Sequence, residues 1–341
     1  MHKYATILVD EMEQQAMNIK INKTTHSNQE ISWITFVNKL GMHLTLCSYG
    51  ASIYEWFYKE PLTLSPENKE KFLTSSCYYG KTVGRVCGRI KDAKYSINDN
   101  TYFLEKNENN NCLHSGKQGF SYKNFQYKIL KGRNATRVVF TYYSKDGEGG
   151  FNGNIALSVS YDIKENNLEF ETIFDVTSDQ DTIINLTSHP YFMLDGGKNS
   201  IKNHYVYISS KEYLTIDSQK IVCKCQEVDD AYDFSKERKL FTNNTISIEY
   251  DHDYVLKNKK GPALIFTSPN RTNKLEVYTN APVVHIYDQN EAEDIMLTNG
   301  KRNTPYTALA IECKKNPLND MVIKANSTQT MWIKYVLINS N

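Results

Sequence analysis

The feature that most constrains the fold is an alternation of apolar and polar residues with a period of two. Apolar residues occupy every second position from Ile155 to Ile163, and a second alternating run follows the polar segment 164–167. Because successive side chains of a β-strand point to opposite faces, this pattern predicts a hairpin with one face in water. Comparable short runs, each bounded by turn-forming residues, recur at 33–37, 138–143, 205–208, 264–267, 275–278 and 331–337.

Helical signals are few. The best candidate is the segment 65–72, where Ser65 can act as N-cap, Pro66 takes the first helical position and the first turn is acidic. No linker rich in Gly, Ser or Pro, no repeat of fixed period and no shift in composition marks a domain boundary. We therefore expect an all-β fold, a large antiparallel β-sandwich, in a single domain over residues 31–341, preceded by an unassigned leader at 1–30.

Charge and composition exclude several classes of function. Lys and Arg number 40 and Asp and Glu 39, so the net charge of +1 argues against a nucleic-acid partner. No apolar run approaches the roughly 18 residues of a membrane-spanning helix, and the N-terminus resembles no signal peptide. The 7 cysteines are odd in number and scattered, which favours reduced thiols over disulfides or a zinc site. We expect a cytoplasmic protein that binds neither membrane nor nucleic acid.

Motifs of several enzyme classes are missing from the sequence. It contains no phosphate-binding G-x-x-x-x-G-K-[ST], no zinc-binding H-E-x-x-H and no G-x-S-x-G of serine hydrolases. The segment 78–90 instead interleaves glycines with Arg85 and Arg89. A guanidinium suits vicinal hydroxyls or a carboxylate, and an arginine that braces a loop is the alternative.

Two histidines and one glutamate stand in settings that suit proton transfer. His114 lies in a turn-rich segment, where a solvated or locally bonded histidine is the alternative. His189 follows an apolar, β-branched run and precedes Pro-Tyr-Phe, so we expect it at a strand end beside aromatic surface that suits a sugar ring. A buried histidine bonded to backbone is the alternative there. Glu312 follows four apolar residues, so we expect it to be buried, and burial raises the pKa of a carboxylate towards the value that a general base needs. A carboxylate paired with an Arg or Lys across the sheet is the alternative there.

Taken in order, these segments resemble the aldose 1-epimerase (galactose mutarotase) family. The matching blocks are 49–53, 79–90, 111–116, 146–153, 185–192, 251–256, 275–282 and 311–317. The resemblance implies the galactose mutarotase-like supersandwich and an isomerase that needs no cofactor and no metal. Its reaction would be the interconversion of α and β anomers of a free aldose such as galactose or glucose. The implied partner is a small monosaccharide, and the implied state is a monomer or a homodimer.

The resemblance also implies roles for individual residues. Glu312 would be the general base and His189 the general acid, which acts in its protonated form because an imidazole titrates near neutral pH. His114 would support the ring oxygen. The residues implied to bind sugar hydroxyls, or to lie beside them, are Arg89, Asp251 and Tyr191.

The chain departs from the family pattern at four substrate-side positions. Gly88 stands where the family commonly has Asn, Ser188 and Pro190 replace Asn and Thr on either side of the acid histidine, and His285 replaces Gln. Gly88 and His285 are therefore further candidates for substrate contact, and the departures bear on sugar specificity rather than on reaction type. Two alternatives stay open: a sugar-binding sandwich without mutarotase activity, and an epimerase for a disaccharide reducing end, a pentose or a sugar phosphate.

Overall fold

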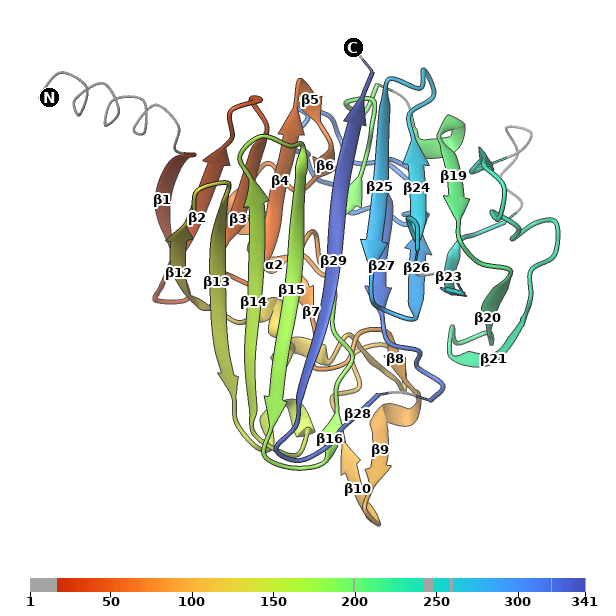
Figure 1. Cartoon of the computed structure of the whole chain (residues 1–341). Helices are drawn as coiled ribbons and strands as arrows, with labels where there is room; N and C mark the ends of the chain where they lie inside the picture. Colours follow the sequence, from red (N-terminus) through yellow and green to blue (C-terminus); the bar gives the residue numbers. More distant parts are fainter. Residues whose placement is uncertain (1–16, 199, 242–247, 258–259, 320, 341) are drawn as a thin grey trace, which may run out of the picture.

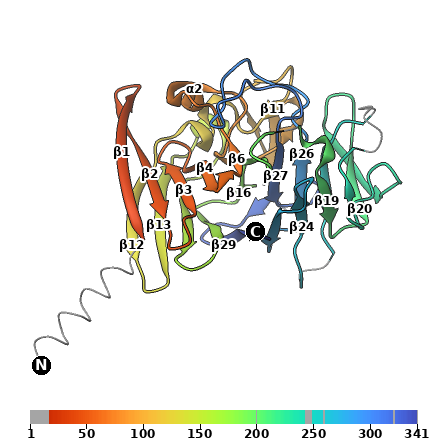
Figure 2. The same cartoon turned by 90° about the horizontal axis from the view of Figure 1, so that it is seen from above.

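The structure, a computed structural model, describes residues 17–198, 200–241, 248–257, 260–319 and 321–340. Its main strands form sheets of five, nine and seven strands. In Figures 1 and 2 the five-stranded and seven-stranded sheets stand side by side in one layer, and the nine-stranded sheet forms the layer that faces them. The expected all-β sandwich is confirmed.

The five-stranded sheet contains the first described residues of the chain. Its strands, in spatial order, are β1 (Asn18–His26), β2 (Gln29–Val37), β3 (His43–Cys47), β4 (Ser52–Tyr58) and β5 (Glu60–Pro61). Strand β1 pairs with β2 along its whole length, so this sheet begins before the expected boundary at residue 31. Residues 1–16 of the expected leader lie outside the described residues, and the leader itself stays a prediction.

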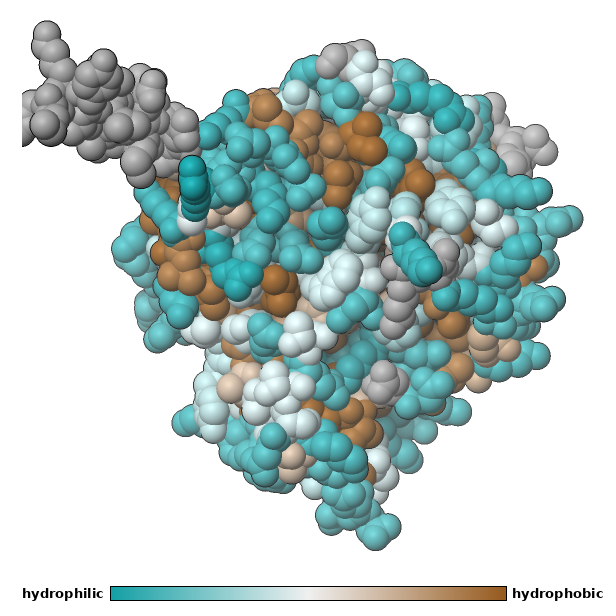
Figure 3. Space-filling view, viewed as in Figure 1, coloured by the Kyte–Doolittle hydropathy of each residue, from teal (hydrophilic) through white to brown (hydrophobic). Residues whose placement is uncertain are grey.

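The nine-stranded sheet contains the predicted hairpin, which is the pair β14 and β15. The strands, in spatial order, are β12 (Gln126–Lys131), β13 (Ala135–Ser144), β14 (Ile155–Lys164), β15 (Glu169–Ser178), β29 (Thr328–Asn339), β25 (Asn273–Thr279), β24 (Leu264–Thr267), β19 (Tyr205–Ile208) and β22 (Arg238–Lys239). Figure 3 shows the outer side of this layer, where hydrophilic residues cover most of the surface and hydrophobic ones form separate areas. One face of the sheet is therefore wet, as the alternation predicts.

The seven-stranded sheet carries the residues that matter for function. Its strands, in spatial order, are β21 (Val222–Glu227), β20 (Glu212–Ile216), β23 (Asp251–Val255), β26 (Val283–Tyr287), β27 (Leu309–Lys314), β18 (Tyr191–Phe192) and β6 (Thr63–Leu64). Every residue of β27 is buried. Ile311 and Cys313 belong to the main hydrophobic core, so Glu312 and Lys314, on the other face of the strand, are turned away from that core.

Among the described residues, four short strand pairs lie outside the large sheets. They are β7 (Thr82–Val83) with β17 (Thr187–Ser188), β8 (Arg89–Ile90) with β11 (Cys112–Leu113), β9 (Lys94–Ile97) with β10 (Asn100–Phe103), and β16 (Thr182–Ile183) with β28 (Val322–Ile323). Two of these pairs, β7 with β17 and β8 with β11, hold the loops that carry candidate site residues.

Four aromatic rings join the three sheets at the centre of the core. The Trp56 ring of β4 lies 5.0 Å from the Phe170 ring of β15 and 6.5 Å from the Phe192 ring of β18. The Tyr335 ring of β29 lies 5.1 and 5.3 Å from the same two phenylalanines. Because large aromatic side chains bury much apolar area, this cluster fixes the two layers against each other.

The helix prediction is correct in kind and wrong at its start. Helix α2 (Lys69–Thr74) begins after Asn68, whose side chain accepts a hydrogen bond from the Lys71 amide at 3.0 Å. Ser65 is not the cap, because it is buried and Pro66 forms an isolated β-bridge with Leu297. Within the described residues, no helix is long and apolar enough to cross a membrane.

Candidate active site

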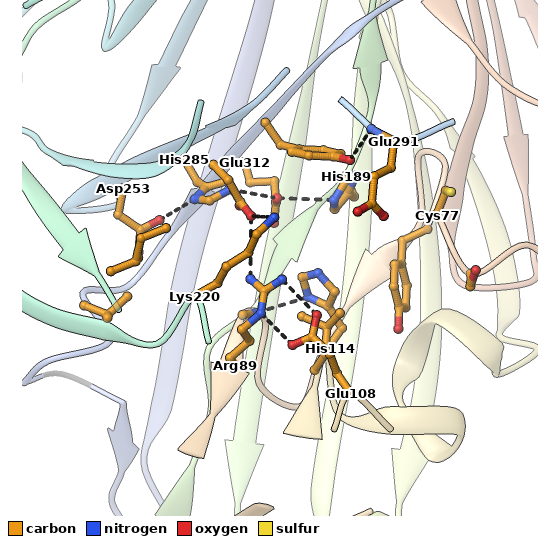
Figure 4. A pocket seen from close by; sticks show the side chains of 18 of the residues that line it. Cys77, Arg89, Glu108, His114, His189, Lys220, Asp253, His285, Glu291 and Glu312 are labelled. Atoms are coloured by element: carbon orange, nitrogen blue, oxygen red, sulfur yellow. Dashed lines mark hydrogen bonds and ion pairs between the residues drawn. The ribbon is translucent and has the colours of Figure 1, made fainter. Parts of the chain in front are cut away.

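A cavity of about 530 Å³ opens over the face of the seven-stranded sheet that is turned away from the core (Figure 4). Strands β23, β26 and β27 form its floor. Its walls come from loops that lie far apart in the sequence, at 76–78, 88–89, 108–114, 216–222 and 287–293. A ligand in this cavity meets side chains from most of the length of the chain.

The register of the three floor strands places a row of ionisable side chains across the cavity. Asp253 of β23 pairs with His285 of β26, and His285 pairs with Glu312 of β27. Directly paired residues point to the same face of a sheet, and so do residues two positions apart on one strand. Asp251 and Lys314 therefore share this face with the row, which Figure 4 shows running from Asp253 through His285 to Glu312.

Backbone pairing on both sides brings His189 to the base. The strand before it, β17, pairs with β7, and the His189 amide donates to the Lys81 carbonyl at 3.1 Å. The strand after it, β18, pairs with β27, where Tyr191 lies opposite Ala310. Consequently His189 Nε2 lies 3.3 Å from Glu312 Oε1, close enough for a proton to be shared.

The pair formed by His189 and Glu312 is almost completely enclosed. The two side chains are 5% and 3% exposed. Burial lowers the pKa of His189 below 6.5, and the negative charge of Glu312 opposes that effect only in part. Among the described residues, His189 Nδ1 and Glu312 Oε2 have no hydrogen-bond partner. Buried polar atoms are normally hydrogen-bonded, so atoms left unpaired in a cavity are candidates for ligand contact.

His114 presents a neutral imidazole. It follows β11, which pairs with β8, and its Nδ1 accepts a hydrogen bond from the Gly88 amide at 3.1 Å. An accepting Nδ1 leaves the proton on Nε2, which makes Nε2 a donor. Burial, reinforced by His189, holds the pKa of His114 well below 6.5. Gly88 itself has a φ of +80°, a conformation that favours glycine.

Arg89 is fixed by two carboxylates. Its Nε and Nη2 donate to the two oxygens of Glu108 at 2.6 and 2.9 Å, and its Nη1 lies 3.8 Å from Asp251 Oδ2. The same Asp251 oxygen lies 3.1 Å from the ammonium of Lys220. A bidentate pair of this kind holds the guanidinium plane in one orientation.

His285 is clamped between two aspartates of β23. Its Nδ1 lies 2.7 Å from Asp253 Oδ1, and its Nε2 lies 3.1 Å from Asp251 Oδ1 and 3.9 Å from Glu312 Oε1. Burial lowers the pKa of His285, as does the charge of Lys314, but the hydrogen bonds to both aspartates outweigh these effects and raise it to about 9. His285 is therefore an imidazolium at neutral pH, with both ring nitrogens as donors.

All eight predicted site residues line this one cavity. They are Gly88, Arg89, His114, His189, Tyr191, Asp251, His285 and Glu312. Their individual roles stay predictions. Arg85, the other arginine of the 78–90 segment, has the structural role that was the alternative for these arginines. It is buried and donates to Ser144 and to the carbonyl oxygens of Asn152 and Lys145. It braces a loop and does not line the cavity.

Sequence reasoning missed six charged residues of the cavity: Glu108, Lys220, Asp253, Glu291, Glu293 and Lys314. Asp253 and Lys314 each lie two residues beyond a predicted site residue and share its face of β23 or β27, so a strand prediction for these two segments would have found them. The other four, Glu108, Lys220, Glu291 and Glu293, lie outside strands, in parts of the chain without a regular period.

The chemistry of the cavity suits an uncharged, polyhydroxylated ligand. Arg89, Lys220 and Lys314 each lie within 4.0 Å of a carboxylate, so none offers an uncompensated positive charge. Across the described residues, no group of three or more His, Cys, Asp or Glu side chains is arranged to hold a metal ion. The pair of His189 and Glu312 can move protons, while the surrounding donors and acceptors can hold hydroxyls.

Comparisons with known proteins by sequence and by structure agree on one family. The family model described as aldose 1-epimerase matches residues 32–332. The galactose mutarotase of Mus musculus is 30% identical and covers 73% of this chain and 73% of its own length. The maltose epimerase of Levilactobacillus brevis is 24% identical over 91% of this chain and 96% of its own. The crystal structure of galactose 1-epimerase from Lactobacillus acidophilus has a TM-score of 0.86 at 22% identity, over 96% of this chain and 100% of that one.

Proposed function

The chain belongs to the aldose 1-epimerase family, and from this premise we propose that the cavity converts the α and β anomers of free galactose or glucose into each other. The observation that carries the proposal is the enclosed pair of Glu312 and His189, 3.3 Å apart, each with a buried polar atom that lacks a partner among the described residues. Ring opening of an aldose needs one group that takes a proton and one that gives a proton, at the two oxygens that are bonded to C1 of the sugar.

The reaction uses the two groups in one direction and then in reverse. Glu312 removes the proton of the anomeric hydroxyl while His189, as imidazolium, donates a proton to the ring oxygen and the bond from C1 to that oxygen breaks. The open-chain aldehyde rotates about its C1–C2 bond and exposes its other face. His189 then takes back the proton from the hydroxyl, Glu312 returns its proton to the carbonyl oxygen, and the ring closes with both residues restored. Each positioned proton transfer contributes about 10²- to 10⁴-fold in rate.

The remaining predicted residues hold the sugar. His114 offers a neutral Nε2–H, which supports the ring oxygen without competing for its proton. Arg89 and Asp251 bind hydroxyls from positions fixed by Glu108 and Lys220. The ring of Tyr191, 5.0 Å from that of His189, supplies apolar surface for one face of the pyranose.

A disaccharide with a free reducing end is a second candidate substrate. The cavity continues past the proton-transfer pair to the segments 76–78 and 216–222, and the relative from Levilactobacillus brevis is named a maltose epimerase. A sugar phosphate is a poorer candidate, because a phosphate prefers cations that carboxylates do not already neutralise.

The test is polarimetry on freshly dissolved α-galactose, α-glucose and α-maltose. Glu312→Gln and His189→Ala should each lower kcat at least about 100-fold, since each removes one proton-transfer group. His252→Ala is the control: His252 lies between Asp251 and Asp253 on β23 and so points to the other face of that strand, where its ring packs 4.8 Å from Tyr232. Its loss should leave kcat within a few-fold of wild type.

Two results would contradict the proposal. A wild-type rate no faster than buffer with all three sugars would remove the activity. A Glu312→Gln enzyme with near-wild-type kcat would leave the activity in place and show that another group is the base.

A further inference from the structure

Asp253 and Lys314 form a charged pair inside the cavity to which neither the proposed chemistry nor the family comparison gives a part. Lys314 Nζ lies 2.8 Å from Asp253 Oδ1, and the two side chains are 6% and 3% exposed. Both residues line the cavity, on the same face of the sheet as Glu312. Because Lys314 lies two residues beyond Glu312 on β27, its Cα is about 7 Å further along the strand. The pair therefore flanks the site of proton transfer.

The pair has unused hydrogen-bonding capacity on both sides. An ammonium has three N–H donors, and Asp253 is the partner of Lys314 Nζ among the described residues. The Asp253 carboxylate uses Oδ1 for both Lys314 and His285, and its Oδ2 has no partner in the described part of the chain. Leaving such groups unpaired in a buried site is costly unless a ligand completes them.

Gly88 leaves the space in which the ammonium sits. A Cβ atom built on Gly88 would lie 3.7 Å from Lys314 Nζ, with no other atom within 4 Å. A side chain at position 88 would therefore extend towards the ammonium and displace it or cover it. Because Gly88 has no side chain, space is open at this point of the cavity wall, and the ammonium of Lys314 with its N–H donors lies beside that space.

We propose that Lys314 and Asp253 form a specificity subsite that binds two neighbouring hydroxyls of the aldose, with Lys314 donating to one oxygen and Asp253 accepting from the other. This inference rests on the proposed function for the identity of the ligand as an aldose. A donor and an acceptor on adjacent side chains match a vicinal diol, each hydroxyl of which both donates and accepts. Hydrogen bonds that involve charged groups in a buried site discriminate strongly against a ligand that lacks one hydroxyl.

The charges of the subsite favour a diol over an anionic group. An anion close enough to bind Lys314 would also face the Asp253 carboxylate, 2.8 Å from the same ammonium, and the unpaired Oδ2 of Asp253 would repel it. A neutral hydroxyl pair satisfies both members and leaves the ion pair intact.

The experiment pairs protein variants with deoxy sugars. Calorimetric Kd values are measured for the best substrate and its 2-, 3-, 4- and 6-deoxy analogues. The measurements use the Glu312→Gln background, where we expect turnover to be slow, with and without Lys314→Met. Two analogues lacking neighbouring hydroxyls should bind about 10- to 100-fold more weakly than the parent, and Lys314→Met should remove most of the difference for one of them. Lys315→Met is the matched control: Lys315 follows the last residue of β27, does not line the cavity and donates from its Nζ to Gln329 Oε1, so the deoxy pattern should not change.

The outcomes separate this inference from the proposed function. A deoxy pattern without two sensitive neighbouring positions, or a pattern that Lys314→Met leaves unchanged, overturns the subsite even if the wild-type enzyme is active. Tighter binding of galacturonate than of galactose, lost in Lys314→Met, overturns the diol in favour of an anion. If Lys314→Met does not fold, Lys314→Gln replaces it, because glutamine keeps a neutral donor while losing the charge. Sugar binding without turnover by the wild type would contradict the proposed function alone.

Discussion

The most exacting prediction concerns His285, the imidazolium held between Asp251 and Asp253. Replacing it with glutamine keeps a side chain that donates and accepts but removes the group that titrates. The pKa of His285 is about 9 in the folded chain, against an ordinary value of 6.5. The two aspartates therefore bind the protonated ring more tightly in the folded state than water does in the unfolded state.

The size of the effect follows from the two pKa values. The interval between 6.5 and about 9, at about 1.36 kcal/mol for each pKa unit, corresponds to about 3 kcal/mol. The folded-state pKa is raised, so this contribution is fully present below pH 6.5, declines as the pH rises and is lost above about pH 9. The wild type should thus lose about 3 kcal/mol of unfolding free energy relative to His285→Gln between pH 6 and pH 10.

The assay is urea unfolding of both proteins at half-unit steps over that range. Other groups titrate there too: the pKa of buried Lys81 is lowered to about 7 and that of Asp288 is raised to about 7, in both cases mainly by burial. These groups are common to both proteins, so the difference between the two stability curves isolates His285. Parallel curves would show that the pKa of His285 is the same in the folded and the unfolded chain, so that the two aspartates do not stabilise the imidazolium.

Two further predictions concern the acid and the core. Because burial lowers the pKa of His189 below 6.5, the imidazolium is the minor form at pH 7. We therefore expect kcat/KM, measured by polarimetry, to rise as the pH falls from 8 towards 6. A value of kcat/KM that falls over this range would mean that His189 is not the acid. Trp56→Ala removes the ring that contacts both Phe170 and Phe192 and should lower the unfolding free energy by about 3 to 5 kcal/mol. A loss below about 1 kcal/mol would show that the packing of the three sheets does not depend on the Trp56 ring.

The strands could be predicted from the sequence because they depend on local alternation. The predicted hairpin is β14 with β15, and the runs at 205–208 and 264–267 are strands β19 and β24 with the same bounds. The helix predicted at 65–72 begins at Lys69, because Pro66 forms a β-bridge with Leu297 and the Ser65 carbonyl accepts a hydrogen bond from the Thr298 amide, both partners lying far away in the sequence. A local signal cannot anticipate such a partner.

The sequence by itself was enough to predict an all-β isomerase of the aldose 1-epimerase family, and it supplied the eight candidate residues of the cavity. Only the tertiary structure decided how they act on one another. The pKa of His285 depends on two aspartates from another strand, and the pKa of His189 depends on how completely it is buried. The pairing of Lys314 with Asp253 depends on the register of three strands. Residue types and their spacing are properties of the chain, whereas charge, burial and distance arise only when distant segments pack together.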